Sequence, residues 1–222
     1  MLELRIAGRN FAQPVLGEVF AHIASGDRIC LLGPSGIGKT TLLNAIAGLD
    51  KTVPEDAVVG RDRVRVGYLF QEHRLLPWRS LRQNLAIVGA TDDEICRLLA
   101  SVGLEGYADH LPDQLSLGMA RRAALARCLA VKPDLLLLDE PFASLDPVRA
   151  KELKDLILAL LEQFPGMAMI CVTHDVVDAT EMANRLWYLD GQPASLQWDG
   201  PVEKEIKLDT LLQKLRAGDI TA

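Results

Sequence analysis

Cysteine and positive charge are both scarce in this sequence. Its four cysteines, Cys30, Cys96, Cys128 and Cys171, lie far apart in apolar stretches and include no C-x-x-C pair. We interpret them as reduced core thiols rather than as metal ligands or disulfides. Lys and Arg number 24 against 30 Asp and Glu, for a net charge of -6. A dedicated nucleic-acid binder needs an excess of cations to neutralise phosphates, so no nucleic-acid partner is expected.

Long hydrophobic runs are also missing. The longest, Leu156 to Leu161, is far too short to cross a bilayer, and the charged N-terminal stretch has no apolar signal-peptide segment. We found no internal repeat. The length of 222 residues and the 49% hydrophobic content nevertheless allow a substantial core, so a single domain over residues 1–222 is expected.

Strand-like and helical segments alternate along the chain. Strands are predicted at Leu2–Ile6, Arg28–Leu32, Val64–Phe70, Leu135–Asp139, Met167–Val172 and Leu186–Leu189. Crossover helices are predicted at Lys39–Ala47, Pro147–Gln163 and Val176–Ala183. This alternation predicts an α/β fold with a mostly parallel central sheet, and the first strands form a candidate antiparallel edge.

Between Gln71 and Lys132 the pattern is helical only, with helices predicted at Leu81–Ile87, Asp92–Val102 and Gly118–Val131. We interpret residues 72–132 as a helical subdomain inserted into the core. Apolar residues at helical spacing from Leu208 to Leu215 predict a final helix, which packs on its own domain or binds a partner.

A glycine-rich segment, GPSGIGKT, spans Gly33 to Thr40 between a predicted strand and a predicted helix. It fits the phosphate-binding pattern G-x-x-x-x-G-K-[ST]. Glycines let main-chain N–H groups turn toward phosphate oxygens, and the helix start adds positive potential. Lys39 can reach the β and γ phosphates and Thr40 can hold Mg²⁺. A glycine-rich turn with a chance lysine is the plain alternative.

Two carboxylates follow the four leucines of LLLLDEPF. A buried strand delivers Asp139 to the carboxyl edge of the sheet, where open α/β sheets bind ligands. Asp139 can therefore take part in the coordination shell of Mg²⁺. Glu140 is the better candidate for orienting and polarising an attacking water. A strand that merely ends in a helix cap would look the same without the phosphate loop.

These motifs together resemble the nucleotide-binding subunits of ABC transporters, from Phe11 to about Leu189. Gly33 to Thr40 is similar to Walker A, Gln71 in YLFQE to the Q-loop, Leu115 to Met119 to the signature, and Leu135 to Glu140 to Walker B. Ser144 to Asp146 resembles the D-loop, and His174 in CVTHD resembles the switch histidine. The resemblance implies an ATPase of the P-loop NTPase fold that uses ATP and Mg²⁺.

The resemblance also implies roles for single residues. The nucleotide contacts would comprise Gly33, Pro34, Ser35, Gly36, Gly38, Lys39, Thr40, Thr41, Gln71 and Asp146. Thr40, Gln71 and Asp139 would serve the metal. Glu140 and His174 would be catalytic, with His174 at the γ-phosphate. Phe11 would stack on adenine, although an aromatic residue near a strand end is as often part of the core.

The signature implies a dimer, in which Ser116 and Gly118 bind the γ-phosphate of ATP held by a second copy or a homologous subunit. Two residues depart from the usual LSGGQ: Leu117 replaces a glycine and Met119 replaces the glutamine. Leu117 must point away from the nucleotide or crowd it. Arg121 and Arg122 fit a solvated or packing face as well as a phosphate-facing one.

The family further implies membrane permease subunits as partners, with an extracytoplasmic solute-binding protein as a further candidate. The segment Glu72 to Leu85 would receive the coupling helix of the permease, unless it is a loop that packs on the helical lobe. Its LLPW stretch resembles importers of the nitrate, sulfonate and taurine type. The expected location is peripheral, at the cytoplasmic face of the inner membrane.

The sequence leaves two other functional classes open. A soluble ABC-type ATPase of DNA repair or translation would usually add a tandem domain, a long coiled coil or zinc cysteines, which the sequence does not show. A P-loop kinase or GTPase fits less well, because of the signature and His174 and because no N-K-x-D-like guanine motif is evident.

Overall fold

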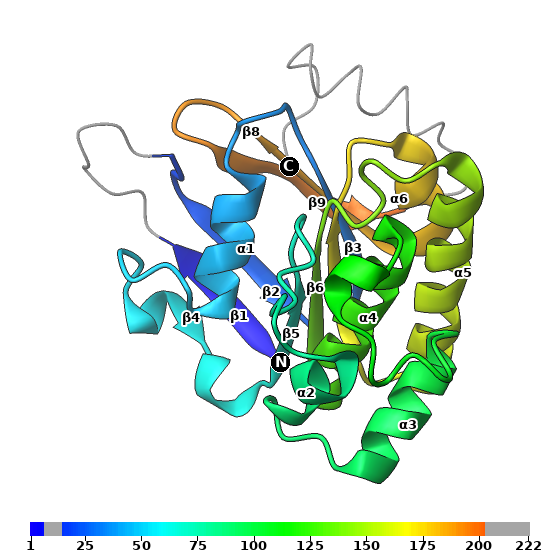
Figure 1. Cartoon of the computed structure of the whole chain (residues 1–222). Coiled ribbons are helices and arrows are strands. Elements are labelled where there is room, and N and C mark those ends of the chain that lie inside the picture. Colours follow the sequence, from blue (N-terminus) through cyan, green and yellow to red (C-terminus); the bar gives the residue numbers. More distant parts are fainter. Residues whose placement is uncertain (7–14, 203–222) are drawn as a thin grey trace. The chain divides into compact units, whose positions relative to one another are not determined.

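The computed structural model describes residues 1–6 and 15–202, which fall into two compact units. The first unit contains the described residues up to Val64 and those from Ala168 onward, and the second runs from Arg65 to Met167. Figure 1 traces both along the chain. Among the described residues, no helix combines the length and apolar character needed to cross a membrane.

The first unit holds most of the strands. Its elements are β1 (Leu2–Ile6), β2 (Val19–Ile23), β3 (Arg28–Leu32), α1 (Lys39–Ala47), η1 (Glu55–Ala57), β4 (Val58–Val59), η2 (Arg61–Arg63), β7 (Ala168–Val172), α6 (Val176–Met182), β8 (Arg185–Asp190) and β9 (Ser195–Pro201). β1 pairs antiparallel with both β2 and β4. β3 pairs parallel with β7 and β8, and β9 joins β8 antiparallel. β3 after Arg28 and β7 along its whole length are apolar and buried, as expected for strands covered on both faces.

The second unit is mainly helical. Its elements are β5 (Val66–Leu69), α2 (Leu81–Ala86), α3 (Asp92–Ser101), η3 (Pro112–Gln114), α4 (Leu117–Ala130), β6 (Leu135–Asp139) and α5 (Pro147–Gln163). β5 and β6 run parallel. α2, α3 and α4 pack on one another, as the green helices of Figure 1 show. Capping boxes at Ser80 and Thr91 start α2 and α3 by pairing main-chain N–H groups that lack a helical partner.

The predicted α/β fold with mostly parallel strands and an antiparallel edge is confirmed. β1, β3, β6, α1 and α5 have the predicted bounds, and the other predicted elements differ by one or two residues at an end. The sequence did not predict β2, β4 or β9. β4 has only two residues, and β9 contains polar residues and is a strand through its pairing with β8. β2 is apolar except for His22, so its pattern was a visible signal that the prediction missed.

Three further expectations have different outcomes. All four cysteines are free thiols, but Cys96 is exposed on α3, so its assignment to the core is wrong. The buried residues of that helix are Ile95 and Leu99, and Cys96 lies beside this buried side rather than on it. Residues 72–132 contain α2 to α4 and lie within the larger second unit, and the boundaries of the inserted subdomain stay a prediction. The predicted helix near Leu208 lies outside the described residues.

Candidate functional site

A tight loop joins β3 to α1 in the first unit. Gly33 has a φ of +154°, and a Cβ there would lie 2.3 Å from the carbonyl oxygen of Leu189. Gly38 has a φ of +115°, and its Cβ would lie 2.9 Å from Cγ1 of Val15. Only glycine fits both the backbone conformation and the space at these two positions. The main-chain N–H groups of this loop are therefore not covered by side chains at Gly33 and Gly38. They lie at the start of a nine-residue helix, an arrangement that attracts a phosphate.

Lys39 spans this loop. Its Nζ donates hydrogen bonds to the carbonyl oxygens of Gly33 and Pro34, each at 2.8 Å, and the side chain is 8% exposed. A lysine ammonium is a compact charge with several donors, so it can serve loop oxygens and a phosphate from one place. The neighbouring Thr40, at the first turn of α1, is exposed. The chemistry of this group of residues fits a nucleotide phosphate with its magnesium ion.

His174 leaves the same edge of the first unit. β3 and β7 are parallel, with Leu31 opposite Val172, so the segments that follow these two strands start side by side. His174 is exposed two residues after the end of β7. The structure thus brings the phosphate loop and His174 to one edge, as their positions after predicted strands indicated.

A buried hydrogen bond supports the turn that carries His174. Thr173 Oγ1 donates to Asp178 Oδ2 at 2.9 Å, and the main-chain N–H of Asp175 donates to Thr173 Oγ1 at 3.1 Å. Thr173 and Asp178 are both nearly buried. Sequence reasoning missed this pair, although a threonine directly before the histidine was a visible signal.

The carboxylates of the second unit lie at the end of β6. β5 and β6 are parallel, with Leu69 opposite Leu138, and so Gln71 and Glu140 leave the same edge. Gln71 Nε2 donates to Glu140 Oε2 at 3.5 Å, which is a long contact. Asp139 is 4% exposed, whereas Glu140 is half-buried. The predicted grouping of Gln71 with Walker B is therefore present within this unit.

Asp139 acts on a neighbouring tyrosine, whereas Glu140 has a strained backbone. Burial, and then the charge of Asp139, raise the pKa of the Tyr68 hydroxyl, which stays protonated at neutral pH. Glu140 has a φ of +47°, an uncommon conformation for a residue with a side chain. Such a residue costs on the order of 1–3 kcal/mol and persists only where its surroundings hold it. Its carboxylate direction is therefore set by a turn rather than by the strand.

The helix α4 begins one residue earlier than predicted. Ser116 is its N-cap, and the Ser116 hydroxyl accepts a hydrogen bond from the N–H of Met119 at 3.3 Å. Leu117 is the first helical residue and is 45% exposed, so its side chain points outward at the helix start. Arg121, a residue whose role the sequence left open, is 5% exposed and packs inside the unit, as does most of α4.

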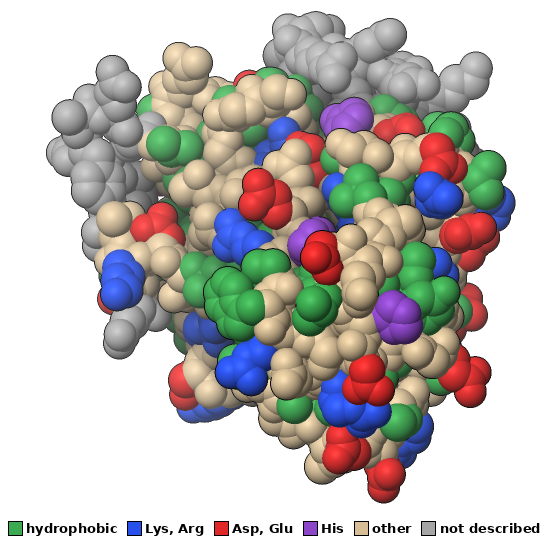
Figure 2. Space-filling view, viewed as in Figure 1, with side chains coloured by type: hydrophobic (Ala, Val, Ile, Leu, Met, Phe, Trp, Pro, Cys, Tyr) green, Lys and Arg blue, Asp and Glu red, His purple; other side chains and the backbone are tan. Residues whose placement is uncertain are grey.

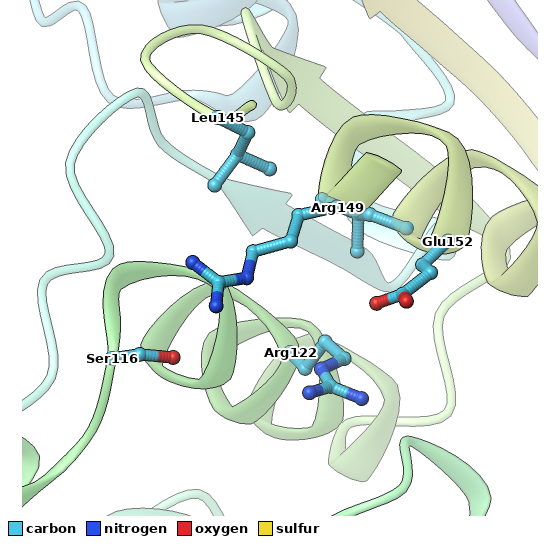
Figure 3. A pocket seen from close by; sticks show the side chains of 7 residues that line it. Ser116, Arg122, Leu145, Arg149 and Glu152 are labelled. Carbon is cyan, nitrogen blue, oxygen red and sulfur yellow. The ribbon is translucent and has the colours of Figure 1, made fainter. Parts of the chain in front are cut away.

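A small hollow lies between the start of α4 and the start of α5. Its lining residues are Ser116, Gly118, Arg122, Leu145, Arg149, Glu152 and Leu153. Figure 3 shows Arg149 extending from α5 toward α4. A Cβ on Gly118 would lie 3.4 Å from Cδ of Arg149, and Asp146 caps α5 by accepting from the N–H of Arg149. Gly118 thus allows the two helices of this unit to approach closely.

The remaining expected site residues are placed as follows. Pro34, Ser35 and Gly36 are exposed in the phosphate loop, Thr41 is half-buried in α1, and Phe11 lies outside the described residues.

Comparisons with known proteins identify the family. The family model described as ABC transporter matches residues 16–143. The chain belongs to the ABC transporter family. This ABC subunit is 41% identical over 220 residues to the aliphatic sulfonates import ATP-binding protein SsuB 2 of Burkholderia cenocepacia, covering 94% of the chain and 78% of the relative. It is 36% identical over 230 residues to the protein of that name from Pseudomonas syringae pv. tomato, covering 99% and 97%.

Solved structures agree with this assignment. The ABC subunit matches a dimeric post-hydrolysis state of an ATP-binding cassette bound to ADP and phosphate, with a TM-score of 0.75 and 27% identity over 91% of this chain and 99% of the other. An ATP-binding subunit of an ABC transporter matches in fold, with a TM-score of 0.80 at 23% identity, 97% of this chain and 99% of the other. The P-loop NTPase fold is thereby confirmed. This ABC subunit is an ATPase, and its cofactors are ATP and Mg²⁺.

Proposed function

We propose that this ATPase is a subunit of an importer, that it dimerises around two ATP–Mg²⁺, and that it couples hydrolysis to movement of separate membrane permease subunits. The observation that carries this proposal is the 41% identity to an aliphatic sulfonates import ATP-binding protein over 94% of the chain. Small organic sulfonates are accordingly the proposed cargo class, delivered by an extracytoplasmic solute-binding protein.

The first unit binds the nucleotide in this proposal. The phosphate contacts come from Gly33, Pro34, Ser35, Gly36, Gly38, Lys39, Thr40 and Thr41. The bare loop and the position of Lys39 Nζ support this role. Adenine stacking is assigned to Phe11. His174 contacts the γ-phosphate, a role supported by its place at the same edge as the loop.

The second unit supplies the hydrolytic groups. Glu140 accepts the proton of the attacking water and orients it in line with the γ-phosphate. Asp139 and Gln71 would serve the magnesium ion from this unit, and Thr40 would serve it from the first unit. The buried position of Asp139 and the contact between Gln71 and Glu140 support this division of work. Bound Mg²⁺ supplies charge neutralisation on the β and γ phosphates.

The proposed dimer uses the start of α4. Ser116 and Gly118 offer a capped N-terminus of a fourteen-residue helix to the γ-phosphate of the partner's ATP. Asp146 is the N-cap of α5, next to Leu145, which lines the hollow. The dimeric cassette among the similar solved structures supports this arrangement. ATP would then join the two copies and hydrolysis would release them.

Exposed apolar side chains of the second unit are the proposed permease contact. Trp78 is 70% exposed, and Ile87 and Val88 are 63% and 37% exposed. Large exposed apolar groups mark interaction sites when they lie together. On the face drawn in Figure 2, basic and acidic side chains are interspersed, so this face offers no continuous basic area for nucleic acid. We propose that the subunit acts at the cytoplasmic face of the inner membrane, and the similarity to an import ATP-binding protein supports this location.

The test is co-purification with a permease. The tagged protein is co-expressed with the permease genes that neighbour its own gene, and membranes are solubilised and pulled down. The complex should form with the natural chain and weaken with Trp78→Ser. Phe164→Ser, at an apolar residue that is 48% exposed elsewhere in the second unit, is the matched control and should leave the complex intact.

A failure of the co-purification would overturn the transporter role. If the protein remains in the soluble fraction beside an expressed permease, the transporter role fails and a soluble ABC-type ATPase of DNA repair or translation takes its place. The cargo class is tested separately, by stimulation of ATPase activity in the reconstituted complex with an alkanesulfonate-loaded binding protein. Stimulation by other anions alone would contradict it.

A further inference from the structure

The guanidinium of Arg121 lies against the main chain that carries Glu140. Its Nη1 donates a hydrogen bond of 3.1 Å to the carbonyl oxygen of Glu140 and a second one to the carbonyl oxygen of Pro141. Glu140 lies 19 residues after Arg121 in the sequence, and Pro141 lies 20 residues after it. Arg121 therefore ties the middle of α4 to the turn that follows β6.

Packing alone does not account for an arginine in this place. Arg121 is 5% exposed, and burial lowers the pKa of its guanidinium, although the charge of Glu140 acts in the opposite direction. Its Nε has no hydrogen-bond partner among the described residues. A buried cation is costly unless its hydrogen bonds hold something that apolar packing cannot hold. Here they hold two consecutive carbonyl oxygens.

Those two carbonyl groups directly follow the strained φ of Glu140. The φ of +47° at Glu140 turns the chain sharply at the end of β6, and the direction of the Glu140 side chain depends on this turn. Fixing the carbonyl groups of Glu140 and Pro141 fixes the peptide planes that follow the Glu140 Cα. The position of the carboxylate then depends on Arg121 and on the contact with Gln71.

We propose that Arg121 is a positioning residue, which holds the Glu140 carboxylate in its productive orientation by binding the main chain of Glu140 and Pro141. The proposal rests on the proposed function, in which Glu140 activates water. It also links two parts of the mechanism, because Arg121 belongs to the helix that begins at Ser116. A movement of α4 at its phosphate-binding start would reach Glu140 through this guanidinium.

The test compares Arg121→Met and Arg121→Lys with the natural chain in steady-state ATP hydrolysis. Arg121→Met keeps an unbranched apolar stem but removes the guanidinium and both hydrogen bonds. Misplacement of a reacting group by about 1 Å costs on the order of 100-fold in rate, so kcat should fall by about 10- to 100-fold. The KM for ATP should stay within about twofold, because the nucleotide contacts lie elsewhere. Arg121→Lys keeps a cationic donor and should recover part of kcat.

Arg127→Met is the matched control. Arg127 belongs to the same helix, its pKa is also lowered by burial, and it donates to the carbonyl oxygen of His73 at 3.2 Å. Its loss should lower the melting temperature without a selective fall in kcat of the folded protein. An equal fall in kcat for both variants, or an unchanged kcat for Arg121→Met, would overturn the proposal. Arg121→Gln answers the same question if the Met variant does not fold.

A double variant separates this proposal from the one on which it rests. If Arg121 acts through Glu140, adding Arg121→Met to Glu140→Gln should lower the residual kcat by less than about twofold, because coupled residues are not additive. A fully active Glu140→Gln variant would remove Glu140 from catalysis and end both proposals. A Glu140→Gln variant that is inactive beside a fully active Arg121→Met variant would end only the role of Arg121.

Discussion

The substitution Glu140→Gln isolates proton acceptance from every other property of this residue. Glutamine has the shape of glutamate, and it can occupy the same turn with φ near +47° at the same cost. The contact from Gln71 Nε2 can be kept by the new amide oxygen, and the hydrogen bonds from Arg121 go to the main chain, which does not change. The bound geometry should therefore persist while the general base is lost.

The structure sets the expected magnitude. Because no nucleotide contact is removed, the Kd for ATP should change by less than about threefold, which is under about 1 kcal/mol. Loss of general base catalysis costs on the order of 10²- to 10⁴-fold in rate. That range corresponds to about 3–5 kcal/mol in the activation barrier. The variant should thus bind ATP normally and hydrolyse it at least 100-fold more slowly.

Two assays check this. Titration with a fluorescent ATP analogue gives the Kd, and phosphate release under single-turnover conditions gives the rate of the chemical step. Size-exclusion chromatography with ATP and Mg²⁺ should show an accumulating dimer, because hydrolysis no longer separates the copies. Unchanged hydrolysis would remove Glu140 from its role. A large loss of ATP affinity would show that Glu140 acts in binding, and the reasoning from the turn would be refuted.

Three further predictions follow from other parts of the structure. Lys39→Ala should raise the Kd for ATP by at least about tenfold, since it removes a buried charge from the phosphate loop; equal Kd values in a fluorescence titration would contradict this. Leu117→Gly, made in the Glu140→Gln background, should increase the ATP-dependent dimer fraction severalfold, because the outward Leu117 side chain stands at the phosphate-binding helix start; an unchanged fraction by light scattering would show that this side chain does not crowd the nucleotide. Burial, followed by the charge of Arg127, lowers the pKa of His73 in the folded state, so protonation opposes folding and stability should fall as the pH drops below the unfolded value of about 6.5. Denaturant unfolding at pH 7 and pH 5 should show a smaller loss for His73→Gln, and an equal loss would assign the effect to other groups.

The sequence predicted the central strands well for a simple physical reason. Runs such as Leu135–Asp139 are apolar on both faces, and such runs are buried in whatever parallel sheet forms. β9 escaped prediction because Ser195–Pro201 carries polar residues and is a strand only through its pairing with β8. Cys96 was wrongly placed in the core because it lies at the margin of the buried side of α3, which Ile95 and Leu99 form.

Some residues of the candidate site were predicted from the sequence and others were not. Gly33, Lys39, Asp139 and Glu140 were predicted from local motifs, since a phosphate loop and a strand-end carboxylate need only neighbours in sequence. The role of His174 came from the resemblance to the family. The hydrogen bond between Thr173 and Asp178 was missed, because the threonine before His174 was a visible signal but its partner five residues later was not. The role assigned to Phe11 stays a prediction.

The sequence by itself determined the order of motifs, the bounds of the main strands and helices, and the family to which they belong. These properties depend on local residue type and hydrophobic period, which are present before the chain folds. Only the tertiary structure decided what Arg121 does. The sequence left it between a solvated face and a packing face, and its partners lie about twenty residues away on another element. A contact between distant main-chain and side-chain atoms exists only once the helix and the strand have packed, and so no local pattern encodes it.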